Sequence, residues 1–436
     1  MHMTDLIIKK RDGGFLSEEE IRFFTEGYSR KAIPDYQAAA LLMAICIRGM
    51  SEEETLFLTQ AMAFSGETLD LSGIDGVVAD KHSTGGVGDT TTLVVVPLVA
   101  ACGLHVAKMS GAGLGHTGGT IDKLESIPGL RTALPVARFL EIVREVGCSV
   151  VSQNLNLAPA DKMLYALRDV TGTVESLPLI ASSIMSKKLA LGCDALVLDV
   201  KTGAGALLTK VEQAFALAEQ MMRIGERAGI RTRAVVTDMT QPLGCNIGNA
   251  LEVAEAVEIL KGMHEGSRLY QVCMLLAQQM LLCARVTEDA YEAEDMLKKA
   301  LHEEKALETF KRMVAAQGGD VAYIEDEGRL YARAARRYSL ETAQGGVLAA
   351  LNARTVGLAS QRLGAGRESL QDAVDYGAGI CMKKQVGDAV KPGDELAVFY
   401  YDGEEKLQEA VRLYQSAVTI GKASADTTLV HGILAP

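Results

Sequence analysis

The chain has 436 residues, of which 48% are hydrophobic and 23% are charged, a balance typical of soluble globular proteins with two or three domains. Its formal net charge of −12 excludes a broad nucleic-acid-binding surface, so an anionic substrate would need a locally basic pocket. No apolar run reaches membrane-spanning length, and the eight cysteines form no C-x-x-C pair, so we expect reduced thiols in a cytoplasmic protein.

The first 68 residues predict helices. Ser17 and Ser51 each begin an S-x-x-E capping box ahead of periodic apolar residues, and the helical stretch that starts at Pro34 ends near Gly49. From about residue 70, buried apolar runs alternate with glycine-rich loops, which is typical of an α/β layer. The run TLVVVPLVAACG at 92–103 fits either a buried helix or a buried strand.

Helical patterns return with Pro159 and Pro178 at expected helix starts, and buried strands resume near residue 192. We therefore expect an α/β protein: a small all-helical domain, a large α/β domain with a mixed sheet, and a carboxy-terminal α+β part resembling a barrel sandwich. The crossings between the first two lobes predict a hinge. The expected domains are 1–68 and 156–191 (helical), 69–155 and 192–330 (α/β), and 331–436 (carboxy-terminal).

The segment VGDAVKPGDELAVF carries a glycine pattern that also occurs in biotin and lipoyl carrier domains. In those carriers the modified lysine follows the pattern, whereas Lys383 precedes it. The sequence therefore favours a domain with a structural role over a biotin or lipoyl carrier domain.

The segment KHSTGGVGDTTTL, which begins at Lys81, has the composition of an anion-binding loop. Its glycines allow backbone amides to converge on one oxyanion, and Lys81, Ser83 and Thr92 offer a charge and hydroxyl donors. It is neither a Walker loop nor a dinucleotide-binding motif. Alone, it fits an ordinary glycine-rich turn as well.

A second loop, at 107–129, repeats this chemistry with Lys108, Ser110, Thr120 and five glycines in the run from 111 to 119. Each loop follows an expected strand, so the two would meet beyond the carboxyl edge of the sheet. Two such loops at one edge favour a phosphate site.

The motifs KHSTGGVGDTTTL and SGAGLGHTGGTIDKLESIPG resemble those of the thymidine and pyrimidine-nucleoside phosphorylase family, and the likeness spans the chain, more loosely after about residue 330. The resemblance implies reversible phosphorolysis of uridine, thymidine, deoxyuridine or an analogue to free base and (deoxy)ribose 1-phosphate. It also implies a cleft that closes between lobes and a homodimer formed through the helical domain. No organic cofactor is expected, and inorganic phosphate would be the co-substrate.

Carried onto this sequence, the resemblance implies three groups of site residues. The catalytic residues would be His82, Arg168 and Lys187, with Ser183 and Leu207 also at the base. The residues implied for phosphate are Lys81, Ser83, Gly85, Thr92, Lys108, Ser110 and Thr120. Those implied for a monovalent cation such as potassium are Gly88, Thr90, Leu243, Asn246 and Glu255.

The residue types suit the chemistry of this reaction. Phosphate is itself the nucleophile, and donors aimed at the departing base stabilise its developing negative charge. Ser183 and Lys187 are four apart on an expected helix and share a face, and His82 can hydrogen-bond or protonate the base. Taken alone, Lys187 would fit a solvated charge and Arg168 a salt-bridge partner of Asp161 or Asp169.

Two alternatives remain open. One is a phosphoribosyltransferase of the anthranilate type, although no paired acidic motif for magnesium lies near the loops. The other is a catalytically inactive binding member of the family.

Four positions depart from the family pattern: Ala112 replaces an arginine, Leu207 a phenylalanine, Leu208 a methionine and Asn154 a threonine. The first two predict weaker phosphate binding and a relaxed base pocket, against the alternative of neutral drift. The preferred nucleoside and the physiological direction do not follow from the sequence.

Overall fold

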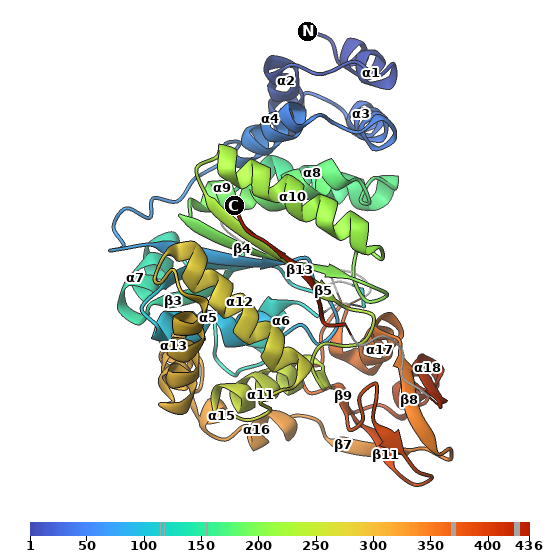
Figure 1. Ribbon diagram of the computed structural model, residues 1–436. Coiled ribbons are helices and arrows are strands. Elements are labelled where there is room, and N and C mark those ends of the chain that lie inside the picture. Colours follow the sequence, from blue (N-terminus) through green and yellow to red (C-terminus); the bar gives the residue numbers. More distant parts are fainter. Residues whose placement is uncertain (114, 117, 154–155, 368–371, 423–427) are drawn as a thin grey trace.

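The computed structural model describes residues 1–436 except 114, 117, 154–155, 368–371 and 423–427. A helical domain, a central α/β domain and a smaller carboxy-terminal domain with two sheets follow one another along the molecule (Figure 1). This arrangement confirms the predicted fold class. None of the described helices is both long and apolar enough to cross a membrane, and all eight cysteines are free.

The amino-terminal helices begin where their caps predict. Ser17 Oγ accepts the Glu20 N–H at 3.3 Å, and Ser51 Oγ accepts the Glu54 N–H at 3.1 Å, so both capping boxes are present. Glu54 is also buried and pairs with the Lys10 ammonium at 2.7 Å. The helices are α1 (Met3–Arg11), α2 (Glu18–Ser29), α3 (Asp35–Arg48) and α4 (Glu52–Ala63).

Two later helices pack against this domain. Leu164 and Leu167 of α8 (Pro159–Thr171) enter its core, and so does Leu179 of α9 (Leu177–Leu191). Other residues of α9, including Met185, belong instead to a core shared with the central sheet. Helix α9 thus contacts both the helical domain and the sheet.

The central sheet has six strands in the order β13-β5-β4-β1-β2-β3. Its first five strands in the chain are parallel, and β13 pairs antiparallel with β5, so the sheet is mixed. The strands are β1 (Val78–Ser83), β2 (His105–Ser110), β3 (Cys148–Ser152), β4 (Ala195–Thr202), β5 (Arg231–Asp238) and β13 (Val430–Leu434).

Helices cover both faces of this sheet. Along β4, Leu196, Leu198 and Val200 pack toward α9 and α10, whereas Ala195 and Val197 pack toward the core that contains α5 and α12. The run at 92–103, which the sequence left open between helix and strand, lies largely in helix α5. It lacks a polar face because this helix is buried all round. The helices of this domain are α5 (Thr91–Ala101), α6 (Thr120–Glu125), α7 (Val136–Val146), α10 (Val211–Arg227), α11 (Asn249–Leu260), α12 (Arg268–Ala284), α13 (Ala290–His302), α14 (Lys305–Ala316), α15 (Ala322–Glu325) and α16 (Gly328–Tyr331).

The carboxy-terminal domain contains antiparallel sheets in the orders β10-β8-β12 and β6-β9-β11-β7. It is tied to the central domain twice, because β6 comes from the central segment and β13 returns to the central sheet. Its elements are β6 (Asn246–Ile247), β7 (Arg336–Glu341), β8 (Gly346–Leu351), α17 (Ala353–Ser360), η1 (Gln361–Ala365), β9 (Gly379–Met382), β10 (Ala389–Val390), β11 (Glu395–Tyr401), α18 (Glu404–Ala417) and β12 (Val418–Gly421).

The strand order positions the site. The chain adds β2 and β3 on one side of β1, and then β4 and β5 on the other. Ligands of open α/β sheets bind beyond the carboxyl ends of the strands at such a reversal.

Candidate active site

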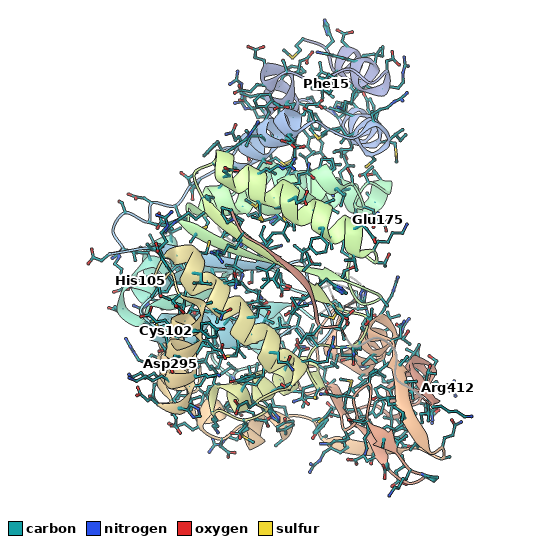
Figure 2. All side chains as sticks on the ribbon, in the orientation of Figure 1. Phe15, Cys102, His105, Glu175, Asp295 and Arg412 are labelled. Atoms are coloured by element: carbon teal, nitrogen blue, oxygen red, sulfur yellow. The ribbon has the colours of Figure 1, made fainter. Side chains whose placement is uncertain are left out.

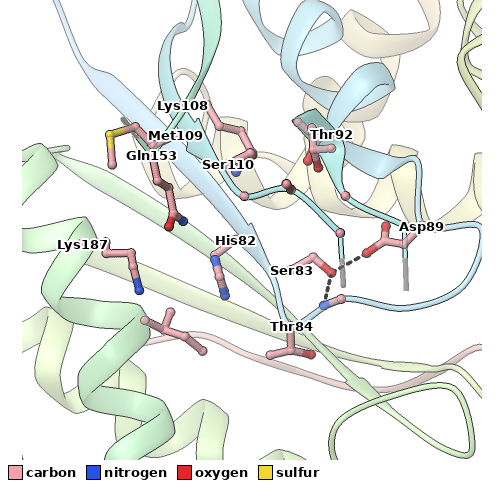
Figure 3. Close-up of a pocket in the computed structure, with 18 of the residues that line it drawn as sticks. His82, Ser83, Thr84, Asp89, Thr92, Lys108, Met109, Ser110, Gln153 and Lys187 are labelled. Atoms are coloured by element: carbon pink, nitrogen blue, oxygen red, sulfur yellow. Dashed lines mark hydrogen bonds between the residues drawn. The ribbon is translucent and has the colours of Figure 1, made fainter. Parts of the chain in front are cut away.

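A pocket of about 240 Å³ lies at the carboxyl ends of β1, β2 and β3, with α9 forming its opposite wall (Figure 3). It brings together most of the residues that the sequence implied for phosphate and base. Those that line it are His82, Ser83, Gly85, Thr92, Lys108, Ser110, Thr120 and Lys187. Lys81, Arg168, Ser183 and Leu207 are described but are not among the residues that line it.

The loop after β1 is organised by Asp89, a residue to which sequence reasoning assigned no role. Ser83 Oγ donates to Asp89 Oδ2 at 2.5 Å, and Thr91 Oγ1 donates to Asp89 Oδ1 at 2.6 Å (Figure 3 shows the first). Although burial alone would raise the pKa of Asp89, nearby lysine ammonium groups hold it below its usual value. The sequence feature that could have indicated this role is the position of an acidic residue, Asp89, among the hydroxyl residues of the loop. Asp89 therefore orients the loop and stays ionised.

Lys81 lies beneath the pocket rather than in it. Successive strand residues point to opposite faces, so Lys81 reaches Thr91 on the α5 side of β1, whereas His82 lines the pocket. Burial lowers the pKa of the Lys81 ammonium. The Lys81 carbonyl accepts a hydrogen bond from Lys108 Nζ at 2.5 Å, which links the two predicted phosphate loops.

Lys108 and Lys188 share one buried carboxylate. Asp80 Oδ2 lies 2.6 Å from Lys188 Nζ, and Asp80 Oδ1 lies 3.6 Å from Lys108 Nζ. Burial lowers the pKa of Lys108 to about 7, with Asp80 opposing the shift. Lys188 lines the pocket too, and sequence reasoning missed it although it is adjacent to Lys187. The pocket therefore holds a cation whose charge changes near neutral pH.

Three hydroxyl groups at this end of the pocket have no side-chain partner among the residues that the structure describes. Thr92 lies in the first turn of the buried helix α5, Ser110 ends β2 and Thr120 begins α6. Within the described part of the chain, none of their hydroxyls is engaged in a hydrogen bond, and all three residues line the pocket. They are donors available to a ligand.

His82 projects into the pocket on the side of Lys187 (Figure 3). Burial lowers its pKa well below the ordinary value, and the charges of Lys188 and Lys108 lower it further. The imidazole is therefore neutral at neutral pH. It can donate an N–H hydrogen bond, but it does not carry a spare proton.

Lys187 is held by two residues of the helical side. Its Nζ lies 2.5 Å from Asp161 Oδ2 and 3.4 Å from Ser183 Oγ, so the predicted shared face of Ser183 and Lys187 is real. Asp161, one of two alternative partners considered for Arg168 taken alone, pairs with Lys187. Because Asp161 is buried, it orients an ammonium group that remains partly exposed to the pocket.

Arg168 is committed to the connection between α8 and α9. Its guanidinium donates to the carbonyls of Thr173 at 3.1 Å, Val174 at 2.8 Å and Leu179 at 3.1 Å. It also lies over the ring of Tyr165, 5.5 Å from the centroid. In this structure Arg168 braces the start of α9, and its predicted contact with the base stays a prediction.

The departures from the family pattern occupy different environments. Ala112 lines the pocket, whereas Leu207 is 41% exposed and its neighbour Leu208 is buried. Asn154 lies outside the described residues, but the adjacent Gln153 lines the pocket and points into it (Figure 3). Among the departures that the structure describes, the one at Ala112 lies against the pocket.

The residues implied for a cation gather where the loop after β1 meets the segment before α11. Leu243 N–H donates to the Val87 carbonyl at 3.0 Å, and Glu255 accepts the Asn246 N–H at 2.9 Å. The Gly88 carbonyl accepts the Gly244 N–H at 3.1 Å.

Two carboxylates at this junction differ in their environment. Thr90 donates to Glu252 rather than to Glu255, and Glu252 also pairs with Lys123 at 2.7 Å. Burial raises the pKa of Glu255 to about 7, and the Glu252 charge adds to the shift. Glu255 is thus a buried carboxylate that would gain from a nearby cation.

Comparison with known proteins identifies similar chains and domains. Family models match a glycosyl transferase helical bundle domain at residues 4–66, a glycosyl transferase α/β domain at 75–307, and a pyrimidine nucleoside phosphorylase C-terminal domain at 347–421.

Full-length relatives are similar throughout. The chain is 52% identical over 417 residues to the pyrimidine-nucleoside phosphorylase of Geobacillus stearothermophilus, covering 95% of this chain and 96% of that protein. It is 49% identical over 435 residues to that of Bacillus subtilis, covering 100% of both. An anthranilate phosphoribosyltransferase structure from Thermus thermophilus has a TM-score of 0.59 at 22% identity, over 72% of this chain and 99% of that one, which shows a shared fold alone.

Proposed function

The chain belongs to the pyrimidine-nucleoside phosphorylase family, and from this premise we propose how its pocket divides the work of the reaction. The protein is a glycosyltransferase that catalyses phosphorolysis of pyrimidine nucleosides. A phosphate oxygen bonds to the anomeric carbon, the bond from that carbon to the base breaks, and its electron pair leaves with the base. The phosphoribosyltransferase alternative is not favoured, because only the fold is shared with that enzyme.

Phosphate binds, in this proposal, at the end of the pocket where the loops after β1 and β2 meet. The observation that carries the assignment is the convergence there of unengaged hydroxyls from Thr92, Ser110 and Thr120 with the ammonium of Lys108. Glycine backbone amides beside them can complete an oxyanion cradle. Lys81 supports the same end from below through Thr91.

The base binds at the α9 end, where its departing negative charge needs donors. Lys187 supplies a positive charge held by Asp161, Ser183 supplies a hydroxyl, and neutral His82 supplies an N–H. We propose that closure of the lobes adds Arg168. A neutral His82 acts as a hydrogen-bond donor, so the base leaves as an anion that takes its proton afterwards.

The first test is a direct assay. Incubation with uridine should change the ultraviolet absorbance as uracil forms, and only when phosphate is present. Lys187→Ala should lower kcat/KM on the order of a hundredfold because a transition-state donor is lost. Lys162→Ala, at an exposed position on α8, is the matched control. Phosphate-independent cleavage, or full activity of Lys187→Ala, would contradict the proposal.

We also propose that a monovalent cation such as potassium binds beside Glu255. The support is a buried carboxylate with a raised pKa, whose oxygens receive only the backbone N–H groups of Cys245 and Asn246 among the described residues. Backbone carbonyls of Gly88 and Leu243 would complete the site. Bound there, the cation would neutralise Glu255 and fasten the loop after β1.

The cation proposal has a readout other than activity. Potassium chloride should raise the Tm of the protein relative to tetramethylammonium chloride at equal ionic strength. Glu255→Gln should remove the difference, because it removes the charge that attracts the cation. An equal potassium effect in both proteins would exclude this site.

For assembly and location, we propose a cytoplasmic homodimer formed through the helical domain. Tyr36, Met43 and Ile47 form an exposed apolar stripe on α3, and Phe15 is 68% exposed nearby in the same domain. A stripe of this kind favours a partner surface of the same composition. The free cysteines favour a reducing compartment.

A further inference from the structure

An arginine of the carboxy-terminal domain contacts the loop that follows β2. We call the described residues 111–113, 115–116 and 118–119 the glycine loop, which follows β2. Its residues 111–113 and 118–119 line the pocket. Arg367 lies just after η1, and its carbonyl accepts the Gly115 N–H at 3.1 Å. Its guanidinium Nη1 donates to the Gly113 carbonyl at 3.4 Å. Both the main chain and the side chain of Arg367 therefore contact the loop.

Asp122 connects Arg367 to the rest of the loop. Its Oδ1 lies 2.6 Å from Arg367 Nη2, and its Oδ2 accepts the Gly113 N–H at 2.6 Å. A β-carbon at Gly119 would lie 2.7 Å from that same Oδ2 and 2.0 Å from the Gly113 nitrogen. The two ends of the glycine loop thus close tightly around one carboxylate.

The ion pair between Asp122 and Arg367 is sensitive to substitution because Asp122 is buried. Asp122 is 3% exposed, so its charge is stabilised mainly by the arginine and the loop amide. Removing one partner of a buried ion pair leaves the other charge uncompensated, which is strongly unfavourable. Ala112, within the glycine loop itself, carries no charge. The cationic group that contacts Asp122 is instead Arg367, which belongs to the carboxy-terminal domain.

We propose that Arg367 is a positioning residue for phosphate. Through Asp122 it holds the backbone of the glycine loop in the shape that binds the anion, and it does so without touching the substrate. The proposal rests on the assignment of this end of the pocket to phosphate. It gives the carboxy-terminal domain a direct part in the affinity of the enzyme for its co-substrate.

The test separates phosphate affinity from the rest of catalysis. Arg367→Ala should raise the phosphate KM on the order of tenfold, about 1.4 kcal/mol, while kcat and the uridine KM change less than about twofold. Arg367→Lys should recover part of the loss, and Asp122→Asn should resemble Arg367→Ala. Arg412→Ala is the control, because Arg412 lies on α18 at the outer side of the same domain (Figure 2).

A double variant, Asp122→Asn with Arg367→Ala, should be no worse than either single variant, because the two residues act as a unit. An unchanged phosphate KM in Arg367→Ala would overturn the inference. So would a parallel loss of Tm, kcat and uridine affinity, which marks a merely structural role. If Arg367→Ala does not fold, Arg367→Lys and Asp122→Asn carry the same test. Absence of phosphate-dependent cleavage in the unmodified protein would instead refute the proposed function.

Discussion

The titration of Lys108 predicts how phosphate affinity depends on pH. Burial lowers the pKa of Lys108 from 10.5 to about 7. The neutral amine therefore predominates above that pH, and the positive charge is present below it. A group with this pKa is roughly one-tenth protonated at pH 8 and about one-hundredth at pH 9. If only the ammonium form binds phosphate, the phosphate KM should rise up to tenfold per pH unit above about pH 7.

The perturbation that isolates this effect is Lys108→Arg. A guanidinium remains protonated throughout this range, so the variant should show a nearly flat phosphate KM from pH 7 to 9. Initial rates at saturating uridine and varied phosphate would give both profiles. Ionisation of phosphate itself is common to the two proteins and cancels in the comparison.

Two further variants complete the experiment, one without a titrating charge at position 108 and one with Lys108 intact. Lys108→Met should raise the phosphate KM at every pH and remove the slope, because no titrating charge remains. Lys162→Ala should keep the profile of the unmodified protein. The reasoning would be refuted if Lys108→Arg kept the same steep rise, because the titrating group would then lie elsewhere.

Four other predictions concern the base, the departures from the family pattern and assembly. Asp161→Asn should lower kcat roughly tenfold with an unchanged phosphate KM, because Lys187 loses the carboxylate that orients it. Ala112→Arg should lower the phosphate KM more than twofold by adding a charge at the pocket, measured by phosphate titration. Leu207→Phe should leave the uridine-to-thymidine ratio within about twofold because Leu207 is exposed, and a larger change would show that this position contacts the base. Ile47→Asp should convert a homodimer to a monomer in light scattering at micromolar concentration, because it places a charge in the apolar stripe of α3.

Each of these has its own contrary outcome. Asp169→Asn, at an exposed position on the same helix as Asp161, should leave kcat unchanged, and equal losses in both variants would exclude an orienting role. No change in phosphate KM on introducing arginine at Ala112 would mark that departure as neutral. A monomeric mass for the unmodified protein would exclude the proposed dimer.

Local sequence determined much of this protein. Ser17 and Ser51 mark helix starts because a capping box needs only residues three apart. Ser183 and Lys187 share a face for the same short-range reason. The two glycine-hydroxyl-lysine loops follow strands, and parallel strands bring such loops to one edge, so the pocket could be expected before its geometry was known.

Tertiary structure decided which groups face the pocket and what holds them. In this structure the backbone of residues 173–179 folds back to accept hydrogen bonds from Arg168, so the proposed contact of Arg168 with the base needs closure of the lobes. Asp161 was an equally plausible partner for Arg168, and packing of α8 against α9 assigned it to Lys187. These choices depend on how helices pack, which local patterns do not encode.

The contact between Arg367 and Asp122 is the feature of the site that the sequence predicts least. The two residues are hundreds of positions apart, and neither belongs to a motif that names the other. They meet because β6 and β13 fasten the carboxy-terminal domain to the central sheet and so place η1 beside the glycine loop. Residue chemistry alone indicated phosphate, whereas the support of the phosphate loop from another domain arises only when the whole chain is folded.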